Sequence, residues 1–190
     1  MVHRTRIKTI LADNFYPEND AEVLYNVTLD LSYVETNYGY EIPQFNFVQG
    51  GVLEVCEHII GEPLIMLPEV SGTFRKPMHG IHFEGFKHPD EWCFIVSLDY
   101  TECLFNYYSH SSGAQNALQG YQFAYKNLFE WVLDGSVILK RNQGIFFRPW
   151  MFHSMEHGLV QYFRFRTKSA DDELKTNENQ DQGSENMDDK

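Results

Sequence analysis

The chain has 190 residues, of which 43% are hydrophobic, so it can form one well-buried core but is short for two ordinary domains. Its formal net charge of −12 argues against nucleic-acid binding, because surfaces that bind phosphate backbones carry a basic excess. Three cysteines without framework spacing indicate reduced thiols. No stretch is long and apolar enough for a signal peptide or a membrane span. We therefore expect a cytoplasmic protein.

The last 23 residues differ in composition from the rest. Residues 168–190 contain eight acids and three lysines but only one Leu and one Met as large apolar residues. Such a segment cannot bury enough apolar surface to form a core. We expect one domain over residues 1–167 and a disordered acidic tail over residues 168–190.

The first third of the chain predicts mixed α/β structure. Residues 8–17 are typical of a short strand that ends in a turn, and residues 19–31 follow with an Asn or Asp cap and apolar residues at helical spacing. A second helix is expected over Val52–Ile60, because Gly61 and Pro63 follow it directly.

The chain then changes to short segments that are rich in aromatic and β-branched residues and separated by Gly, Pro, Asp or Asn. These segments cover residues 64–75, 79–84, 91–100, 103–110, 136–141, 143–150 and 160–167. Their number and length predict a mainly antiparallel jelly roll or barrel, a double-stranded β-helix whose inner mouth can hold a ligand.

One segment interrupts this series. Residues 115–134 have apolar residues at helical spacing and end at Asp134-Gly135. They predict a helical insertion between strands, which either packs over a sheet face or covers the open end of the domain as a lid.

Two His-x-acid pairs lie close together, His82-Phe83-Glu84 and His88-Pro89-Asp90. With eight histidines and 27 acids, chance alone gives on the order of one such match, so the pattern needs support from its context. Residues i and i+2 of a strand face the same way, so His82 and Glu84 can share a metal ion. The best third ligand is His153, which ends another aromatic strand. Two histidines and one carboxylate form the facial triad of non-haem Fe(II) oxygenases, and zinc or manganese would accept the same ligands.

The order of these motifs resembles the iron and 2-oxoglutarate-dependent oxygenases, in particular the small prolyl-hydroxylase-like members of bacteria and phages. The segments that carry the resemblance are "ILADNFYPENDAEVL", "IHFEGFKHPDEWCFIVSLD" and "IFFRPWMFHSM", and it extends over residues 7–167. It implies a double-stranded β-helix, Fe(II) as the metal, 2-oxoglutarate as co-substrate and hydroxylation of an unidentified substrate.

The resemblance also chooses between the two pairs. It places the acidic ligand several residues before a strand that begins near Trp, which fits Glu84, eight positions before Trp92, better than Asp90, two before it. His88 and Asp90 are then loop residues around Pro89. The family usually has Asp where this chain has Glu84.

The resemblance further implies a basic residue about ten positions after the distal histidine that pairs with the far carboxylate of 2-oxoglutarate. Arg164, eleven positions after His153, is the candidate, and Arg166 on the same strand face is the fallback. Tyr108 or Asn106 is expected to reach the bound 2-oxo acid from the strand after the motif.

Two other histidines compete for the ligand role. His79 lies three residues before His82 and therefore on the opposite strand face, and His157 stands beside Gly158 in an apparent turn. The aromatic residues of the β region are either ordinary core or platforms for substrate; they are Phe105, Tyr107, Tyr108, Phe146, Phe147 and Trp150.

A nucleophilic enzyme has little support, because Ser109 and His110 are adjacent and face opposite sides of a strand. Three functions stay open: a 2-oxoglutarate-dependent dioxygenase with no catalytic residue beyond the metal ligands, a non-catalytic β-helix binding module, and a metal-dependent cupin that does not use 2-oxoglutarate. The substrate of the first would be a small molecule or a peptidyl side chain.

Overall fold

The computed structural model describes residues 9–36, 39–43, 51–68, 71–75, 78–114, 116–119 and 128–185. Its helices are α1 (Glu18–Leu29), α2 (Val52–Ile60) and α3 (Lys168–Glu185). In this described part of the chain, no helix combines the length and the apolar character needed to cross a membrane.

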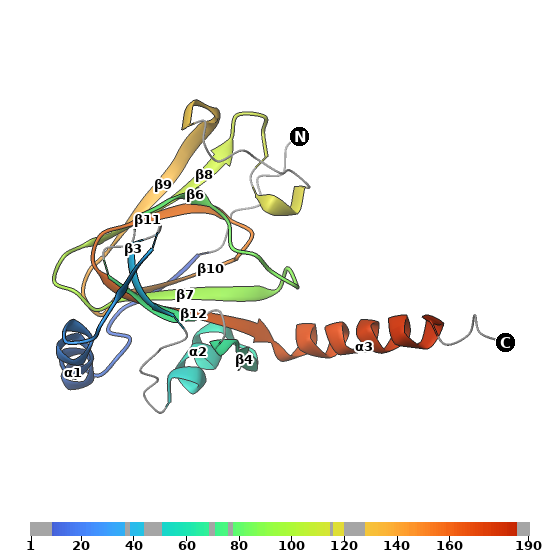
Figure 1. The fold of residues 1–190 in the computed structure, drawn as a ribbon, viewed down its shortest axis with the longest axis horizontal. Coiled ribbons are helices and arrows are strands. Elements are labelled where there is room, and N and C mark those ends of the chain that lie inside the picture. The colour runs from blue at the N-terminus through green and yellow to red at the C-terminus, as the bar shows by residue number, and fades with distance from the viewer. Residues whose placement is uncertain are drawn as a thin grey trace.

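The strands form two antiparallel sheets that face each other (Figure 1). The larger sheet has the order β1-β10-β7-β12-β5-β3-β2, with β4 also paired to β12; the smaller has the order β6-β11-β8-β9. The bounds are β1 Ile10–Ala12, β2 Val34–Thr36, β3 Gly39–Pro43, β4 Leu64–Met66, β5 Gly72–Arg75, β6 Met78–His82, β7 Glu91–Ser97, β8 Cys103–His110, β9 Trp131–Leu139, β10 Gly144–Phe147, β11 Phe152–Glu156 and β12 Leu159–Thr167. This is the expected double-stranded β-helix.

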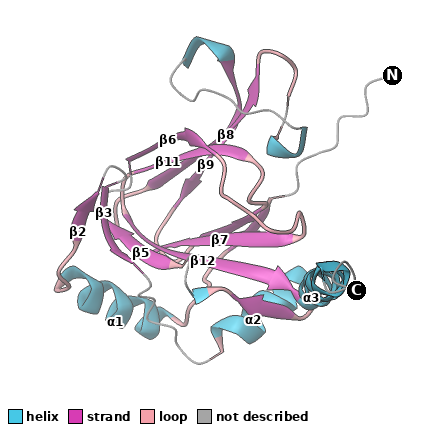
Figure 2. Ribbon diagram, turned by 45° about the vertical axis from the view of Figure 1, so that its right-hand side comes forward, coloured by secondary structure: helices cyan, strands magenta, loops and turns pink. Residues whose placement is uncertain are grey.

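The larger sheet is covered on both faces, which explains why all seven residues of β7 are buried. Phe94 and Val96 belong to an outer core shared with α1 and α2, which lie below this sheet in Figure 2. Cys93 and Ile95 alternate with them and belong to an inner core between the two sheets. The inner core receives side chains from both sheets, so it forms the interior of the jelly roll.

Helix α2 has the expected bounds, and α1 begins at Glu18 after Pro17 without a side-chain cap, where an Asn or Asp cap was expected. Strands β2 and β3 were not expected from the sequence. They form a hairpin in which β3 pairs with β5 at the edge of the larger sheet.

The expected helix over residues 115–134 is only partly open to comparison, because residues 115 and 120–127 lie outside the described residues. The described part contains short 3-10 helices at Ala117–Gln119 and Leu128–Glu130, and β9 already begins at Trp131. The expectation is wrong for the last residues of the range. Val132 and Leu133 pair with β8, so sheet pairing overrides the helical spacing of the apolar residues.

The acidic tail also differs from expectation, since α3 occupies the first 18 of the residues expected to be disordered (Figure 1). Thr167 Oγ1 accepts a hydrogen bond from the Ala170 N–H, which caps the helix. Asp171 pairs with Arg166 of β12 at 2.9 Å and with Lys175, four residues later, at 2.7 Å. These local contacts, which composition does not reveal, begin the helix. The domain boundary at residue 167 stays a prediction.

Candidate metal centre

The two candidate histidines are neighbours across two strands of the smaller sheet. His82 is the last residue of β6 and lies directly opposite His153 of β11, so both side chains share one face. Glu84 follows two residues after His82, and its N–H donates to the Pro149 carbonyl at 2.8 Å. This hydrogen bond ties the segment after β6 to the segment before β11 and brings the carboxylate to the histidine pair.

The three side chains converge. Glu84 Oε1 lies 3.4 Å from His82 Nε2 and 3.7 Å from His153 Nε2, and one ligand atom from each residue lies within 4.8 Å of the others. Ligand atoms about 2.1 Å from one ion lie about 3.0 Å apart when their bonds to it are perpendicular. The two contacts with Glu84 therefore need to shorten by less than about 1 Å around a metal ion.

The backbone orients both imidazole rings. His82 Nδ1 lies 2.7 Å from the Gly80 carbonyl, and His153 Nδ1 lies 2.9 Å from the Met151 carbonyl. A carbonyl oxygen can only accept, so Nδ1 carries the proton in each ring. In a neutral ring, Nε2 then holds the lone pair, and it is Nε2 that points towards Glu84. Metal-ligating histidines are commonly held in this way.

The electrostatics favour a cation at this point. Burial would raise the pKa of Glu84, but the two imidazole rings beside it lower this pKa well below its ordinary value. Burial opposes protonation of His82, yet the adjacent Glu84 raises its pKa. The pKa of His153 is lowered, mainly by burial and then by the nearby His82. An ionised carboxylate thus faces two ring nitrogens.

This donor set fits a divalent transition metal: two imidazole nitrogens, one carboxylate oxygen, and rings already turned for coordination. Within the described ranges, it is the only group of three or more His, Cys, Asp or Glu side chains that is arranged to hold an ion.

The second His-x-acid pair lies elsewhere. His88 Nε2 contacts Glu173 of α3 at 3.2 Å, and His88 Nδ1 lies 3.2 Å from the Asp90 backbone nitrogen. The Asp90 side chain is 62% exposed. As expected for turn residues around Pro89, neither side chain joins the first pair.

The competing histidines do not join it either, as far as they are described. His157 adopts a left-handed backbone with φ of 68° beside Gly158, and its side chain is 68% exposed in the turn between β11 and β12. The backbone of His79 pairs with Met155, but its side chain lies outside the described part.

Arg164 lies on the inner face of the larger sheet. It stands two residues after Tyr162 of the inner core and directly opposite Cys93. Its guanidinium donates to Glu91 Oε2, to the Gly85 carbonyl at 2.6 Å and to the Tyr162 hydroxyl at 3.2 Å. Since Gly85 directly follows Glu84, this arginine reaches the segment that carries the acidic candidate ligand.

Arg166, the fallback, contacts the other oxygen of the same Glu91 and the start of α3. It donates to Asp171 of α3 at 2.9 Å and to Glu91 Oε1 at 3.3 Å. Of the two arginines, Arg164 is the one that contacts the interior residue Tyr162.

No family model matches the chain, and no curated protein sequence matches it significantly. Several solved structures do match. AviO1 from Streptomyces viridochromogenes Tue57 has a TM-score of 0.62 and 10% identity, over 87% of this chain and 92% of that chain. SnoN, the non-heme alpha ketoglutarate-dependent epimerase from nogalamycin biosynthesis, has a TM-score of 0.57 and 12% identity, over 85% and 79%. HygX from Streptomyces hygroscopicus, solved with nickel, 2-oxoglutarate and hygromycin B, has a TM-score of 0.51 and 11% identity, over 85% and 83%.

The chain has the fold of the 2-oxoglutarate-dependent oxygenases. At these identities, the likeness shows the fold and leaves the chemistry to the side chains.

In this oxygenase fold, the structure does not bring Tyr108 or Asn106 to the candidate metal centre. His153 lies opposite Tyr107, whereas Tyr108 lies opposite Phe152 and so on the other face of the sheet. The Tyr108 hydroxyl contacts Ser154 Oγ at 3.0 Å, and Asn106 Nδ2 donates to the same oxygen at 3.4 Å. The expectation that either residue reaches the 2-oxo acid is therefore corrected.

Tyr107 takes the inner position, whereas the sequence offered it only as one of several aromatic candidates for core or substrate contact. Its ring lies over Gly135 of β9, where a Cβ would overlap the ring. Gly135 therefore allows the tyrosine to lie flat on the neighbouring strand. Period-2 alternation alone cannot distinguish Tyr107 from Tyr108, because the choice depends on the register between β8 and β11.

Two of the aromatic candidates are packed around His153. Its ring centroid lies 4.7 Å from that of Phe147 and 5.4 Å from that of Phe105, and both phenylalanines are fully buried. Phe146 belongs instead to the outer core. Phe105 and Phe147 therefore hold the histidine ring in place and exclude water from one side of it.

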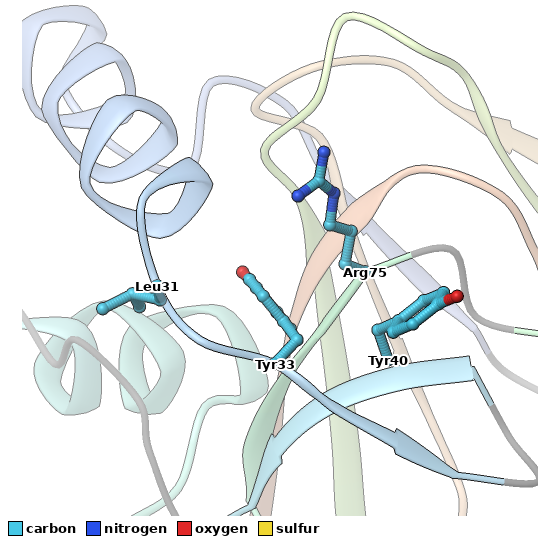
Figure 3. A pocket seen from close by; sticks show the side chains of 4 residues that line it. All are labelled: Leu31, Tyr33, Tyr40 and Arg75. Carbon is cyan, nitrogen blue, oxygen red and sulfur yellow. The ribbon is translucent and has the colours of Figure 1, made fainter.

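A cavity of about 320 Å³ lies away from this centre and is lined by Leu31, Tyr33, Tyr40 and Arg75 (Figure 3). Arg75 lies opposite Tyr40 and follows Phe74, which packs against the inner core, so it lies on the outer face of the sheet. This cavity is separate from the candidate metal centre.

Proposed function

We propose that the protein is a non-haem Fe(II) and 2-oxoglutarate-dependent dioxygenase that hydroxylates a small-molecule or peptidyl substrate. The convergence of His82, Glu84 and His153 inside an oxygenase fold carries this proposal. HygX and SnoN, solved with nickel or iron and 2-oxoglutarate, support the choice of metal and co-substrate. Within this class of enzymes, we infer that it belongs with the small prolyl-hydroxylase-like members of bacteria and phages.

The three side chains have distinct tasks. His82 and His153 would each offer Nε2 to the metal and Glu84 would offer Oε1, so the protein would supply three ligands and leave the remaining positions to 2-oxoglutarate and O₂. Bound iron supplies the redox chemistry that couples oxidative decarboxylation of 2-oxoglutarate to oxidation of a substrate C–H bond. The carbonyls of Gly80 and Met151 keep both rings oriented.

Arg164 serves the co-substrate in this proposal. Its guanidinium is buried on the inner face, where it can pair with the far carboxylate of 2-oxoglutarate. Glu84 is one methylene longer than the usual Asp, and its Oε1 lies at similar distances from both ring nitrogens, which supports its role as a ligand.

Anaerobic titration tests the proposal. The purified protein should bind one equivalent of Fe(II), and addition of 2-oxoglutarate should produce the weak visible charge-transfer band of a chelated complex. Iron binding without that band would favour a cupin that does not use 2-oxoglutarate. Absence of iron binding would favour an inert binding module, whereas zinc or manganese competing at one equivalent would show that the same ligands accept other metals.

A further inference from the structure

The pairing of β8 with β9 in the smaller sheet contains a β-bulge. The register between the two strands shifts between Tyr107 and Tyr108, and Asp134 of β9 is the extra residue at this point. A bulge redirects the side chain of the extra residue, and bulges are frequent next to active sites. Here Ser109 Oγ donates to Asp134 Oδ1 at 3.1 Å. The bulge therefore joins the Asp134 carboxylate to a hydroxyl group of the neighbouring strand.

This Ser109–Asp134 pair lies on the sheet face that carries the candidate metal centre. Tyr107 lies opposite His153 and shares its inner face, and Ser109, two residues later, has the same orientation. The hydrogen bond brings Asp134 to this face as well. The strand order is β11-β8-β9, and Gly135, next to Asp134, lies opposite Tyr107. With a spacing of about 5 Å between strands, Asp134 is about 10 Å from His153 across the sheet.

The inner core ends where this pair begins. Tyr107 packs against the inner core, whereas Val132, which lies opposite Ser109 on the same face, is 51% exposed. Asp134 is exposed too. The ends of β8 and β9 that are farthest from the larger sheet extend past β6 and β11 (Figure 1, Figure 2). An exposed surface with one apolar side chain and one carboxylate thus adjoins the candidate metal centre.

The pair offers only hydrogen-bond acceptors to a ligand. Ser109 gives its one hydroxyl proton to Asp134, so lone pairs remain on its oxygen and on both carboxylate oxygens. In the part of the chain that the structure describes, no ion pair joins Asp134 to a Lys, Arg or His side chain. The nearby acid Glu130 lies 3.6 Å from His110 instead. An alkylammonium group, which has three N–H donors and no acceptor, complements these oxygens in charge and in hydrogen bonding.

We propose that Asp134 and Ser109 bind a protonated primary amine of the substrate and that the carbon chain of the substrate extends past Val132 and Tyr107 towards the metal centre. This inference rests on the proposed function and names the substrate class: a free alkylamine or the side chain of a peptidyl lysine. Both sources present the same ammonium group at the end of an unbranched carbon chain. Asp134 then determines specificity and touches the substrate away from the carbon atom that is oxidised.

The experiment compares n-hexylamine with 1-hexanol, two probes of the same chain length that differ in charge. Titration of the zinc- and 2-oxoglutarate-loaded protein, followed by the NMR shifts of the Ser109 and Asp134 amides, gives the Kd of each probe. Hexylamine should bind more tightly than hexanol by about fivefold or more, as expected for one added ion pair. With Mn(II) in place of zinc, relaxation of the bound hexylamine protons should be fastest at the methyl end, because the amine lies farther from the metal.

Asp134→Asn keeps the shape of the side chain and removes its charge. It should raise the Kd for hexylamine by about fivefold or more and leave the Kd for hexanol within about twofold. The matched control is Asp13→Asn, which changes another exposed aspartate that accepts one side-chain hydrogen bond, from Gln143 Nε2 at 2.7 Å. Asp13 directly follows β1 of the larger sheet, so this substitution should change neither Kd.

A second pair of probes distinguishes the two sources of the amine. These probes are a capped Gly-Lys-Gly peptide and the same peptide with norleucine in place of lysine. A preference for the lysine peptide that disappears in Asp134→Asn assigns the site to peptidyl lysine. A preference for hexylamine over hexanol without a preference between the peptides assigns the site to a free amine.

The remaining results overturn the inference or the function on which it rests. Equal Kd values for hexylamine and hexanol, or a preference that persists in Asp134→Asn, overturn the inference. Mn(II) that binds at one equivalent without affecting the relaxation of hexylamine also overturns it, because the amine then lies away from the metal. Failure of the protein to bind zinc or Mn(II) at all overturns the proposed function itself.

Discussion

The pattern His-x-acid occurs twice within nine residues, and its two copies have different surroundings. His82 ends a strand and faces His153 across the ladder, while Glu84 Oε1 lies near Nε2 of both rings. His88 and Asp90 flank a proline in a loop, and His88 contacts an exposed glutamate of α3. The difference teaches that spacing supplies the residue types, whereas sheet register and backbone carbonyls supply the coordination geometry.

Removing the acid from each pair should give the largest contrast. Glu84→Ala takes away a ligand oxygen, so we expect the affinity for Fe(II) or Mn(II) to fall by about 100-fold or more. Asp90→Ala removes only an exposed loop carboxylate and should change the affinity by less than about twofold. Anaerobic calorimetry measures both values.

The histidines provide the matching test, since His82→Gln should lose metal binding and His88→Gln should keep it. Comparable losses for both pairs would show that the metal lies elsewhere or bridges the two.

The packing around His153 should give a smaller contrast. Phe147→Leu removes a ring that contacts the imidazole, so we expect a loss of about 1 to 1.5 kcal/mol in the free energy of unfolding and a metal affinity several-fold weaker. Phe146→Leu, the adjacent residue, removes a ring that stacks on Phe94 in the outer core. It should cost similar stability but leave metal affinity unchanged. Denaturant unfolding and calorimetry separate the two effects, and equal losses of affinity would rule out a specific role for Phe147.

The two His-x-acid pairs also show how much of the fold and of the site the sequence could predict. Alternating aromatic and β-branched segments predicted the double-stranded β-helix. Strand alternation was expected to bring His82 and Glu84 to one side, but β6 ends at His82, and the hydrogen bond from the Glu84 N–H to the Pro149 carbonyl helps to place the carboxylate instead. The convergence with His153 followed from the order of motifs. Contacts that depend on register could not be predicted, because alternation within one strand does not say which residue lies opposite in the next. Tyr108 was therefore expected where Tyr107 lies.

The point at which the chain crosses from the larger sheet to the smaller one could not be predicted from the sequence either. Phe147 ends a strand of the larger sheet and His153 belongs to the smaller one, although the intervening residues look like one aromatic run. Pro149 has no N–H for a ladder, and Met151 N–H closes a turn on the Arg148 carbonyl at 3.0 Å. The turn itself is a local feature of the sequence. That it brings His153 to the opposite sheet depends on the whole fold.

The smallest effect is expected for the cysteines. They bear on the comparison of the two His-x-acid pairs, because a thiolate could compete with these residues as a metal ligand. Burial raises the pKa values of Cys56, Cys93 and Cys103 to about 12 each. At pH 8 about one thiol in ten thousand is then ionised, so a disulfide reagent should label none of them in the native protein and all of them after denaturation.

The sign of the pH dependence follows from the same values. Above pH 9 the unfolded chain releases thiol protons that the folded protein keeps, so the free energy of unfolding should fall as pH rises. Rapid labelling of one native thiol at pH 8, or protection of that thiol by added Mn(II), would show a cysteine within reach of the metal. Such a cysteine would then be a metal ligand itself, and the contrast between the two His-x-acid pairs would no longer explain metal binding.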